Sequence, residues 1–199
     1  MSDSKQLQFD NLVERVAHCS LCPRMLSRTK VLTSLNGSLH SQIIFVAEAP
    51  GRLGADKYGL PLHGDQTGRN FEMFLNHSGF YRDSVFITNA VLCNPRSIDG
   101  NNDSPTISEI RNCSSFLDET IKIINPQYIV TLGLKALISL NTICHHEISL
   151  SEDIGHLIDW NGHQVFPLYH PGPMAMIKRP KAQQFQDYES ITRIFQTSG

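Results

Sequence analysis

The sequence predicts an α/β fold, a three-layer α/β/α sandwich around a short, mostly parallel sheet of four strands. Short apolar runs alternate with segments of helical periodicity, which is the pattern of such folds. The chain has 199 residues, of which 40% are hydrophobic and 18% charged, and this suffices for one core. Glycine-rich or polar segments follow several apolar runs, as at the carboxyl ends of parallel strands, where such sheets bind ligands. We therefore expect residues 1–199 to form a single domain.

Each expected element has its own local signal. The strands are expected at residues 43–46, 85–88, 128–132 and 165–169, which are short runs rich in apolar and β-branched residues. Helices are expected at 7–17, 71–77, 106–124, 134–140 and 181–195. Thr106 and Glu109 have the spacing of a capping box, which places the start of the third helix at this point. Two long loops are expected, a glycine-rich one over 48–67 and one rich in Asn, Asp and Gly over 95–104.

The charge and hydropathy limit the possible partners. The net charge is −2, from 17 basic and 19 acidic residues, so any contact with nucleic acid must come from a local basic face. Residues 1–10 are polar, and no apolar run reaches the ~20 residues of a membrane helix. We expect a soluble, cytoplasmic protein without a membrane segment.

Four cysteines suggest a metal or cluster site. Cys19 and Cys22 have the spacing of two ligands of one site, Cys93 follows the second expected strand, and Cys113 lies in the next helix. Four thiolates can hold zinc or a [4Fe–4S] cluster, whereas Cys93 and Cys113 could equally be small buried core residues. Cys144 is interpreted as a structural thiol. The neighbouring pair His145-His146 is interpreted as part of a solvated turn rather than as metal ligands.

Several motifs occur in an order that carries a resemblance. After Cys19-x-x-Cys22 the chain contains Ala47-Glu-Ala-Pro-Gly51, Asp56-Lys-Tyr-Gly59, Leu62-His-Gly-Asp-Gln-Thr-Gly68, Ile87-Thr-Asn-Ala-Val-Leu-Cys93-Asn-Pro95, Asn102-Asp-Ser-Pro105, Glu109-Ile-x-x-Cys113, Thr131-Leu-Gly133 and His170-Pro-Gly-Pro173. This ordered set resembles the uracil-DNA glycosylase superfamily, specifically its iron–sulfur branches, families 4 and 5. The resemblance covers about Cys19 to Met176.

The resemblance implies a monofunctional glycosylase of base excision repair. Such an enzyme flips uracil, or a related deaminated base, out of single- or double-stranded DNA and hydrolyses its N-glycosidic bond. The resemblance also favours a [4Fe–4S] cluster over zinc at Cys19, Cys22, Cys93 and Cys113. We expect a monomer that is associated with the nucleoid. Two alternatives stay open: a binding protein of the same fold for damaged or single-stranded DNA with little catalysis, and an unrelated cluster-bearing redox protein.

The expected catalytic residues follow from the chemistry of the reaction. A neutral His170 can donate a hydrogen bond to O2 of the departing base, whose negative charge must be stabilised. Asn89 carries an amide that can pair with the edge of uracil. For positioning the water, the resemblance implies Glu48 and Asp56 by the family 4 pattern and Asp65 by the family 5 pattern, and we rank Glu48 first and Asp65 second. Asp56 is equally well explained as a loop cap and is otherwise assigned to substrate binding.

Further contacts to the base and to DNA are expected around these residues. The backbone of Ala49 to Gly51 is expected to contact the base or a phosphate. Leu62 stands where the family usually has a stacking Phe, so strict uracil specificity is open, with Tyr58 or His63 as possible substitutes. Met174, or Met176, occupies the place of the family's apolar wedge. Phosphate contacts are expected from Arg24, Arg28, Lys30, Lys178, Arg179 and Lys181.

Overall fold

The computed structural model describes residues 2–197 and has the α/β architecture expected from the sequence. The ends of the predicted 1–199 domain, residue 1 and residues 198–199, lie outside the described part. The central sheet has five strands in the order β2-β1-β3-β5-β4. The strands are β1 Ile43–Ala47, β2 Phe86–Asn89, β3 Tyr128–Leu132, β4 Ile158–Trp160 and β5 His163–Leu168. Strands β1, β2, β3 and β5 run parallel, and β4 alone is antiparallel.

The expected four strands did not include β4, because this strand is too short to give a clear signal in the sequence. This strand has only three residues, Ile-Asp-Trp, and pairs with β5. The two strands are joined by Asn161 and Gly162, both with positive φ, at 49° and 83°. Two consecutive residues of this kind form the tight turn that matches the twist of a hairpin. The pair Asn161-Gly162 was therefore the available signal for a hairpin at the edge of the sheet.

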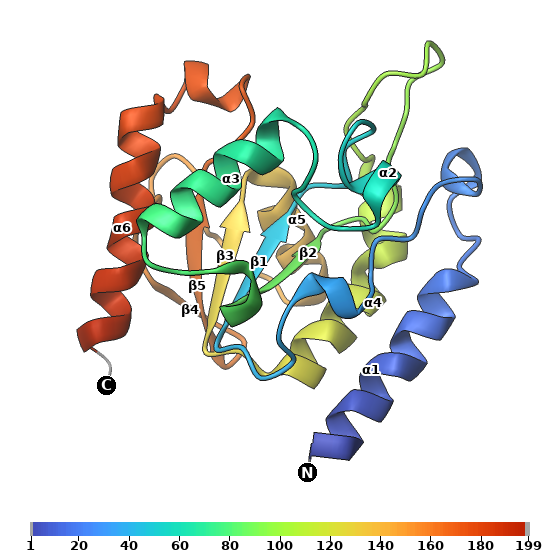
Figure 1. Ribbon diagram of the computed structural model, residues 1–199, viewed down its shortest axis with the longest axis horizontal. Helices are drawn as coiled ribbons and strands as arrows, with labels where there is room; N and C mark the ends of the chain where they lie inside the picture. The colour runs from blue at the N-terminus through green and yellow to red at the C-terminus, as the bar shows by residue number, and fades with distance from the viewer. Residues whose placement is uncertain (1, 198–199) are drawn as a thin grey trace.

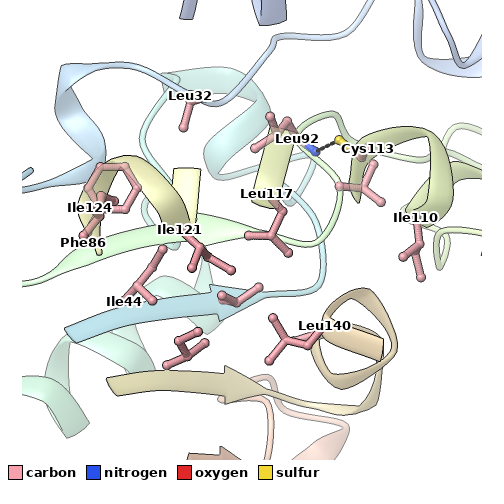
Figure 2. Packing of buried hydrophobic residues seen from close by; sticks show 14 of the residues in the cluster. Leu32, Ile44, Phe86, Leu92, Ile110, Cys113, Leu117, Ile121, Ile124 and Leu140 are labelled. Atoms are coloured by element: carbon pink, nitrogen blue, oxygen red, sulfur yellow. Dashed lines mark hydrogen bonds between the residues drawn. The ribbon is translucent and has the colours of Figure 1, made fainter. Parts of the chain in front are cut away.

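Helices cover both faces of the sheet and make three layers (Figure 1). Helices α1 Ser2–Ala17, α4 Ile107–Ile124 and α5 Leu134–Ile143 pack on one face. Helices α3 Gln66–His77 and α6 Lys181–Thr197 pack on the other. Alternate residues of β1 point to opposite faces, so Ile44 joins the first core and Phe45 the second. Figure 2 shows the first core, in which Cys113 of α4 lies beside Leu117 and Leu92.

The helix starts are fixed by side-chain caps. The predicted capping box of α4 is confirmed, because Thr106 Oγ1 accepts from the amide of Glu109 and Glu109 accepts from the amide of Thr106. Helix α3 begins five residues earlier than predicted, at Gln66, because Asp65 Oδ1 accepts a hydrogen bond of 2.9 Å from the amide of Gly68. The cap therefore extends the helix into the expected loop.

Short helices interrupt the loops and shape the edges of the sheet. They are η1 Pro23–Met25, η2 Ser34–Asn36, α2 Ala55–Tyr58, η3 Arg82–Ser84 and η4 Ala175–Ile177. The segment at η2 covers the outer edge of β2, where Asn36 donates to the carbonyl of Ile87 at 2.7 Å and Gly37 bridges Phe86. The loop between β2 and α4 projects past the carboxyl ends of the strands (Figure 1). Among the described residues, no helix is both long and apolar enough to cross a membrane.

Candidate active site and cysteine site

A cavity of about 560 Å³ lies where strands β1 and β5 end. Its walls come from three segments that are far apart in the sequence: the loop after β1, the loop before α4 and the segment after β5. Seven of the sequence-predicted site residues line it, namely Glu48, Ala49, Gly51, Leu62, Asp65, His170 and Met174. The fold thus places the three predicted catalytic side chains around one space of the size that a small ligand occupies.

His170 is held in one orientation by its own loop. Its Nδ1 accepts a hydrogen bond of 3.1 Å from the backbone amide of Gly172. In a neutral ring the proton is then carried by Nε2, which makes Nε2–H the donor of the ring. Burial lowers the pKa of His170 below its ordinary value, while the carboxylates of Glu48 and Asp65 act in the opposite direction. The site therefore favours a neutral imidazole with a proton on Nε2.

Glu48 follows β1 directly and is half-buried at the cavity wall. Its Oε1 accepts a hydrogen bond of 2.7 Å from the hydroxyl of Ser104, in the loop before α4. Glu48 lies near enough to His170 for its charge to act on that ring. A carboxylate in this position has lone pairs with which it can hold a water molecule.

Asp65 combines a place at the cavity with a structural duty. Its Oδ1 caps α3, and its Oδ2 faces the loop after β1. A Cβ atom added to Gly51 would lie 2.5 Å from Oδ2 of Asp65, so only glycine allows this approach. Asp65 and Glu48 thus each have one oxygen bonded within the protein, Asp65 to the start of α3 and Glu48 to Ser104.

Leu62 lines the cavity in a strained backbone conformation. Its φ is +48°, which is unusual for a residue with a branched side chain, and the side chain is 8% exposed. Arg82 holds the local backbone, because its guanidinium donates to the carbonyls of Pro61 and Leu62, both at 2.9 Å. Arg82 is in turn fixed by Glu72 at 2.6 Å. Of the two suggested substitutes for a stacking ring, His63 lines the cavity and Tyr58 does not.

Asn89 and Asp56 lie outside the set of residues that line the cavity. Asn89 ends β2 opposite Ala47 and is 2% exposed, and its Nδ2 has no hydrogen-bond partner among the described residues. A buried amide without a partner is costly, and a ligand edge could satisfy it. Asp56 instead accepts from Arg96 at 2.5 Å and from the amide of Thr29 at 3.1 Å. These bonds match the loop-capping interpretation of Asp56.

The predicted DNA-contacting cations are in different states. Arg24 is paired with Asp103 at 2.7 Å and with Glu109 at 2.5 Å. The guanidinium of Arg24 holds the pKa of the Glu109 carboxyl below its usual range. Arg179 is paired with Asp187 through two bonds of 2.5 and 2.9 Å. Lys178 is exposed beside η4, as is Met174 at 79%. The charge of Lys178 is thus better placed for phosphate than those of the two arginines.

The remaining basic residues named from the sequence have local roles. Lys30 donates to three backbone carbonyls, those of Met25, Leu26 and Arg28, at 3.1–3.3 Å. Arg28 has a buried Nε without a partner among the described residues. The ammonium of Lys181 lies 5.9 Å from the ring of Phe185.

Cys19, Cys22, Cys93 and Cys113 line a second, mostly apolar pocket between η1, the segment after β2 and α4. All four are free thiols, and Cys113 Sγ accepts from the amide of Leu92 at 3.4 Å (Figure 2). Burial raises the pKa of Cys93 to about 11 and that of Cys113 to about 12. Within the part of the chain that the structure describes, no three His, Cys, Asp or Glu side chains are arranged to hold a single metal ion.

The other candidate ligands are structural. The ring of His146 bonds to the carbonyl of Leu137 at 2.9 Å and to the amide of Ile148 at 3.1 Å. The carbonyl of Cys144 accepts from the indole of Trp160 at 3.0 Å. His145 is exposed, as expected for a solvated turn, whereas His146 is half-buried and its ring is bonded to the backbone.

Five polar residues at the cavity received no role from the sequence: Thr67, Asn94, Asn102, Asp103 and Ser104. Asn94 is buried and donates to the carbonyl of Pro50 at 2.6 Å and to Asn102 at 3.0 Å, which ties the loop after β1 to the loop before α4. The motif Asn102-Asp-Ser-Pro105 was the available signal for three of these residues.

Most of the chain matches a known protein family in sequence. Residues 36–190 match the uracil DNA glycosylase superfamily. The chain belongs to the uracil-DNA glycosylase superfamily. This match covers all five strands and every residue that lines the cavity, so the superfamily assignment rests on the part of the chain that forms the site.

Similarity to individual superfamily members extends over most of the chain. The chain is 40% identical to a type-4 uracil-DNA glycosylase of Thermotoga maritima over 159 residues, which is 79% of this chain and 78% of the relative. It is 32% identical to a type-4 uracil-DNA glycosylase of Sulfurisphaera tokodaii over 193 residues, 94% and 84% of the two chains. A type-5 uracil-DNA glycosylase of Pyrobaculum aerophilum is 27% identical over 194 residues, 83% of each chain. The resemblance to families 4 and 5 is thus confirmed by the names of the relatives.

Proposed function

We propose that the chain is a monofunctional uracil-DNA glycosylase that works as a single domain and hydrolyses the N-glycosidic bond of uracil flipped out of DNA. The observation that carries the proposal is His170, a half-buried ring at the cavity with Nδ1 occupied and Nε2–H left as its donor. The names of the relatives support the substrate, since they are called uracil-DNA glycosylases. The Nε2–H of a neutral His170 can donate a hydrogen bond to O2 of the departing uracil and so stabilise the negative charge that develops there.

The base is proposed to lie in the cavity at the end of β1 and to reach Asn89, which ends the neighbouring strand β2. The unpartnered Nδ2 of Asn89 can donate to a carbonyl of uracil, and its Oδ1 can accept from the ring N–H. Leu62 supplies an apolar contact to the base face, and the backbone from Ala49 to Gly51 forms the adjoining wall. These contacts would select the shape and edge of the base after it leaves the helix.

Glu48 is proposed to hold the attacking water and to stabilise the positive charge that develops on the sugar. Its carboxylate and His170 line the same cavity. Glu48 can therefore act on the sugar side of the breaking bond while His170 acts on the departing base. Asp65, the second-ranked carboxylate, is proposed to add a negative charge at the same cavity.

The four cysteines are proposed to hold a [4Fe–4S] cluster. Their thiols surround one pocket but do not converge on one point, as a single tetrahedral ion would require. A cubane is bound at four separate iron corners, which suits thiols placed around a pocket. The cluster would supply a cross-link between the N-terminal segment, the loop after β2 and α4, outside the cavity where the bond breaks.

Met174 and Lys178 are proposed to contact the DNA. Both are exposed on the segment after β5, and Met174 also reaches the cavity mouth. An apolar side chain at this place can fill the gap that a flipped base leaves, and a lysine can neutralise a neighbouring phosphate. The cellular location that follows is wherever DNA is repaired, the cytoplasm and nucleoid.

A panel of oligonucleotides tests the proposal. Single- and double-stranded substrates carry one uracil, hypoxanthine or xanthine, and alkali then reveals abasic sites. We expect strand breaks with uracil only after alkali, and a loss of about 100-fold or more for His170→Ala, the effect typical of removing a preorganised donor. His156→Ala, an exposed histidine away from the cavity, is the matched control. Binding without cleavage of any substrate would reject the enzyme and leave a DNA-binding protein.

A further inference from the structure

The loop before α4 supplies a direct contact to the proposed water-holding carboxylate. The hydroxyl of Ser104 donates to Oε1 of Glu48 at 2.7 Å, and both residues line the cavity. The two residues are 56 positions apart in the chain and meet only because the loop folds back over the end of β1. The bond uses one oxygen of Glu48 and leaves the other for a ligand or water.

Ser104 is itself held from two sides. Its carbonyl accepts a hydrogen bond of 3.0 Å from Nη2 of Arg24, and its amide donates to Asp103 at 2.9 Å. Arg24 also bonds that aspartate, at 2.7 Å, through Nη1. The loop position of Ser104 therefore depends on a guanidinium from a distant segment.

Arg24 is anchored at the start of α4. Its Nε and Nη2 reach the two oxygens of Glu109 at 2.5 and 2.7 Å, a paired geometry that fixes the plane of the guanidinium. Glu109 also closes the capping box with Thr106. Arg24 follows Cys22 by two residues, so this network joins the cysteine-bearing segment to the wall of the cavity.

We propose that Ser104 is a positioning residue for Glu48, and that Arg24 keeps Ser104 in place. This inference rests on the proposed function and deepens it. A half-buried carboxylate can adopt several rotamers, and a misplacement of a few tenths of an ångström weakens its action on a bound water. The hydroxyl of Ser104 selects one rotamer. Arg24, expected from the sequence to contact phosphate, has this internal role instead.

The effect of Ser104 is expected on the chemical step rather than on binding. Loss of one hydrogen bond to a charged group that acts in the transition state corresponds to about a 10-fold lower rate. Ser104→Ala should therefore lower the single-turnover rate of uracil release about 10-fold while KM changes little. Ser104→Thr keeps a hydroxyl and should restore most of the rate. Ser97→Ala, in the same loop with its hydroxyl bonded to Asn101, is the matched control and should leave the rate unchanged.

A double-mutant cycle separates positioning from a general structural role. In a Glu48→Ala background Ser104 has nothing to orient, so adding Ser104→Ala should cost less than about 2-fold. An equal cost in both backgrounds would overturn the inference, as would full activity of Ser104→Ala alone. An inactive wild type would end the proposed function and this inference together, whereas an active wild type with additive variants would end only the inference.

Arg24 is tested with a readout that does not depend on activity. Arg24→Lys keeps the charge but loses the paired geometry, so it should lower the rate without changing the visible absorbance of the purified protein. Melting temperatures of all variants are measured, and Ser104→Ala should match the wild type. A lower rate of Arg24→Lys that appears only together with lost absorbance would overturn the role of Arg24 and point to the cysteine pocket.

Discussion

At His170, burial and hydrogen bonding act together to keep the ring neutral. The amide of Gly172 occupies Nδ1, and desolvation disfavours the charged form, although Glu48 and Asp65 favour it. The result is a donor that stays neutral at pH values at which a histidine in water takes up a proton. This difference between the folded and unfolded chains makes the ring a source of pH-dependent stability.

The pH dependence has a definite sign. In the unfolded chain His170 takes up a proton near its ordinary pKa of 6.5, while the folded ring resists it because its pKa is lowered. Its contribution to stability is therefore complete above pH 6.5 and is lost as the pH falls toward the folded pKa. We expect the melting temperature of the wild type to fall relative to that of His170→Asn from about pH 7 to about pH 5. A difference that stays constant with pH would contradict the buried, neutral ring.

Leu62 gives a second prediction at the residue scale. Leu62→Phe should place an aromatic face at the cavity, and stacking on a base is worth about 1–3 kcal/mol, so KM for uracil-containing DNA should fall about 10-fold. At this position Arg82 bonds to the backbone carbonyls of Pro61 and Leu62, so these bonds do not depend on the side chain of residue 62. Leu53→Phe, at an exposed position of the same loop, is the control. An unchanged or higher KM would show that the cavity does not present this position to the base.

Some residue contacts were predictable and others were not. The capping box of Thr106 and Glu109 could be predicted because both partners lie within one helical turn. The engagement of Arg24 could not, because Glu109 is 85 residues away and nothing local distinguishes a paired arginine from a free one. The roles of Glu48, Asp65, Asn89 and His170 remain proposals.

At the scale of elements, α6 closes the second core through one large side chain. Tyr188 of α6 packs against Phe45 of β1 and Phe74 of α3, with ring centroids 6.3 and 5.2 Å away. Its hydroxyl is buried and has no hydrogen-bond partner among the described residues. The ring stabilises the layer, while the hydroxyl loses its hydration without compensation.

Removing that hydroxyl should stabilise the protein. Tyr188→Phe keeps the ring and deletes the unpaired group, so we expect a gain of about 1 kcal/mol, or about 2–4 °C in melting temperature. Tyr58→Phe, which deletes an exposed hydroxyl, should have no such effect. A lower melting temperature for Tyr188→Phe would mean that the hydroxyl bonds to a buried water.

The elements themselves were predicted unevenly, for physical reasons. Helix α4 was predicted closely because its capping box marks the start, and in the structure it ends where Asn125 adopts a left-handed conformation. Strand β4 and helix α2 are three and four residues long, too short to show a period in the sequence. The start of α3 was missed because Asp65 lies within a run of glycine and polar residues that indicates a loop.

For the whole molecule, the four cysteines are expected to be a source of stability. If they hold a cluster, Cys113→Ser should abolish the visible absorbance and lower the melting temperature by more than about 5 °C, or about 2 kcal/mol. Cys144 lies outside that pocket, so Cys144→Ser should keep the absorbance. A colourless wild type with bound zinc would contradict the cluster.

The overall architecture was the most predictable level. Strands and helices alternate along the chain, and right-handed crossovers leave few arrangements for such a pattern. The sequence could also place the polar segments at one end of the sheet, since parallel strands share a direction. The meeting of Glu48 with Ser104 could not be predicted, because it depends on how a loop of irregular structure folds.

The two borders of the sheet also bear on how the protein behaves in concentrated solution. The segment at η2 occupies the hydrogen-bonding groups beside β2, and at the other border β4 offers only three residues. Unpaired borders are where foreign chains add as extra strands and where aggregates begin. One edge strand is covered and the other has only three residues, so few free backbone groups are left for another chain to pair with. A monomer that stays dispersed at high concentration is the expected outcome, and light scattering measures it.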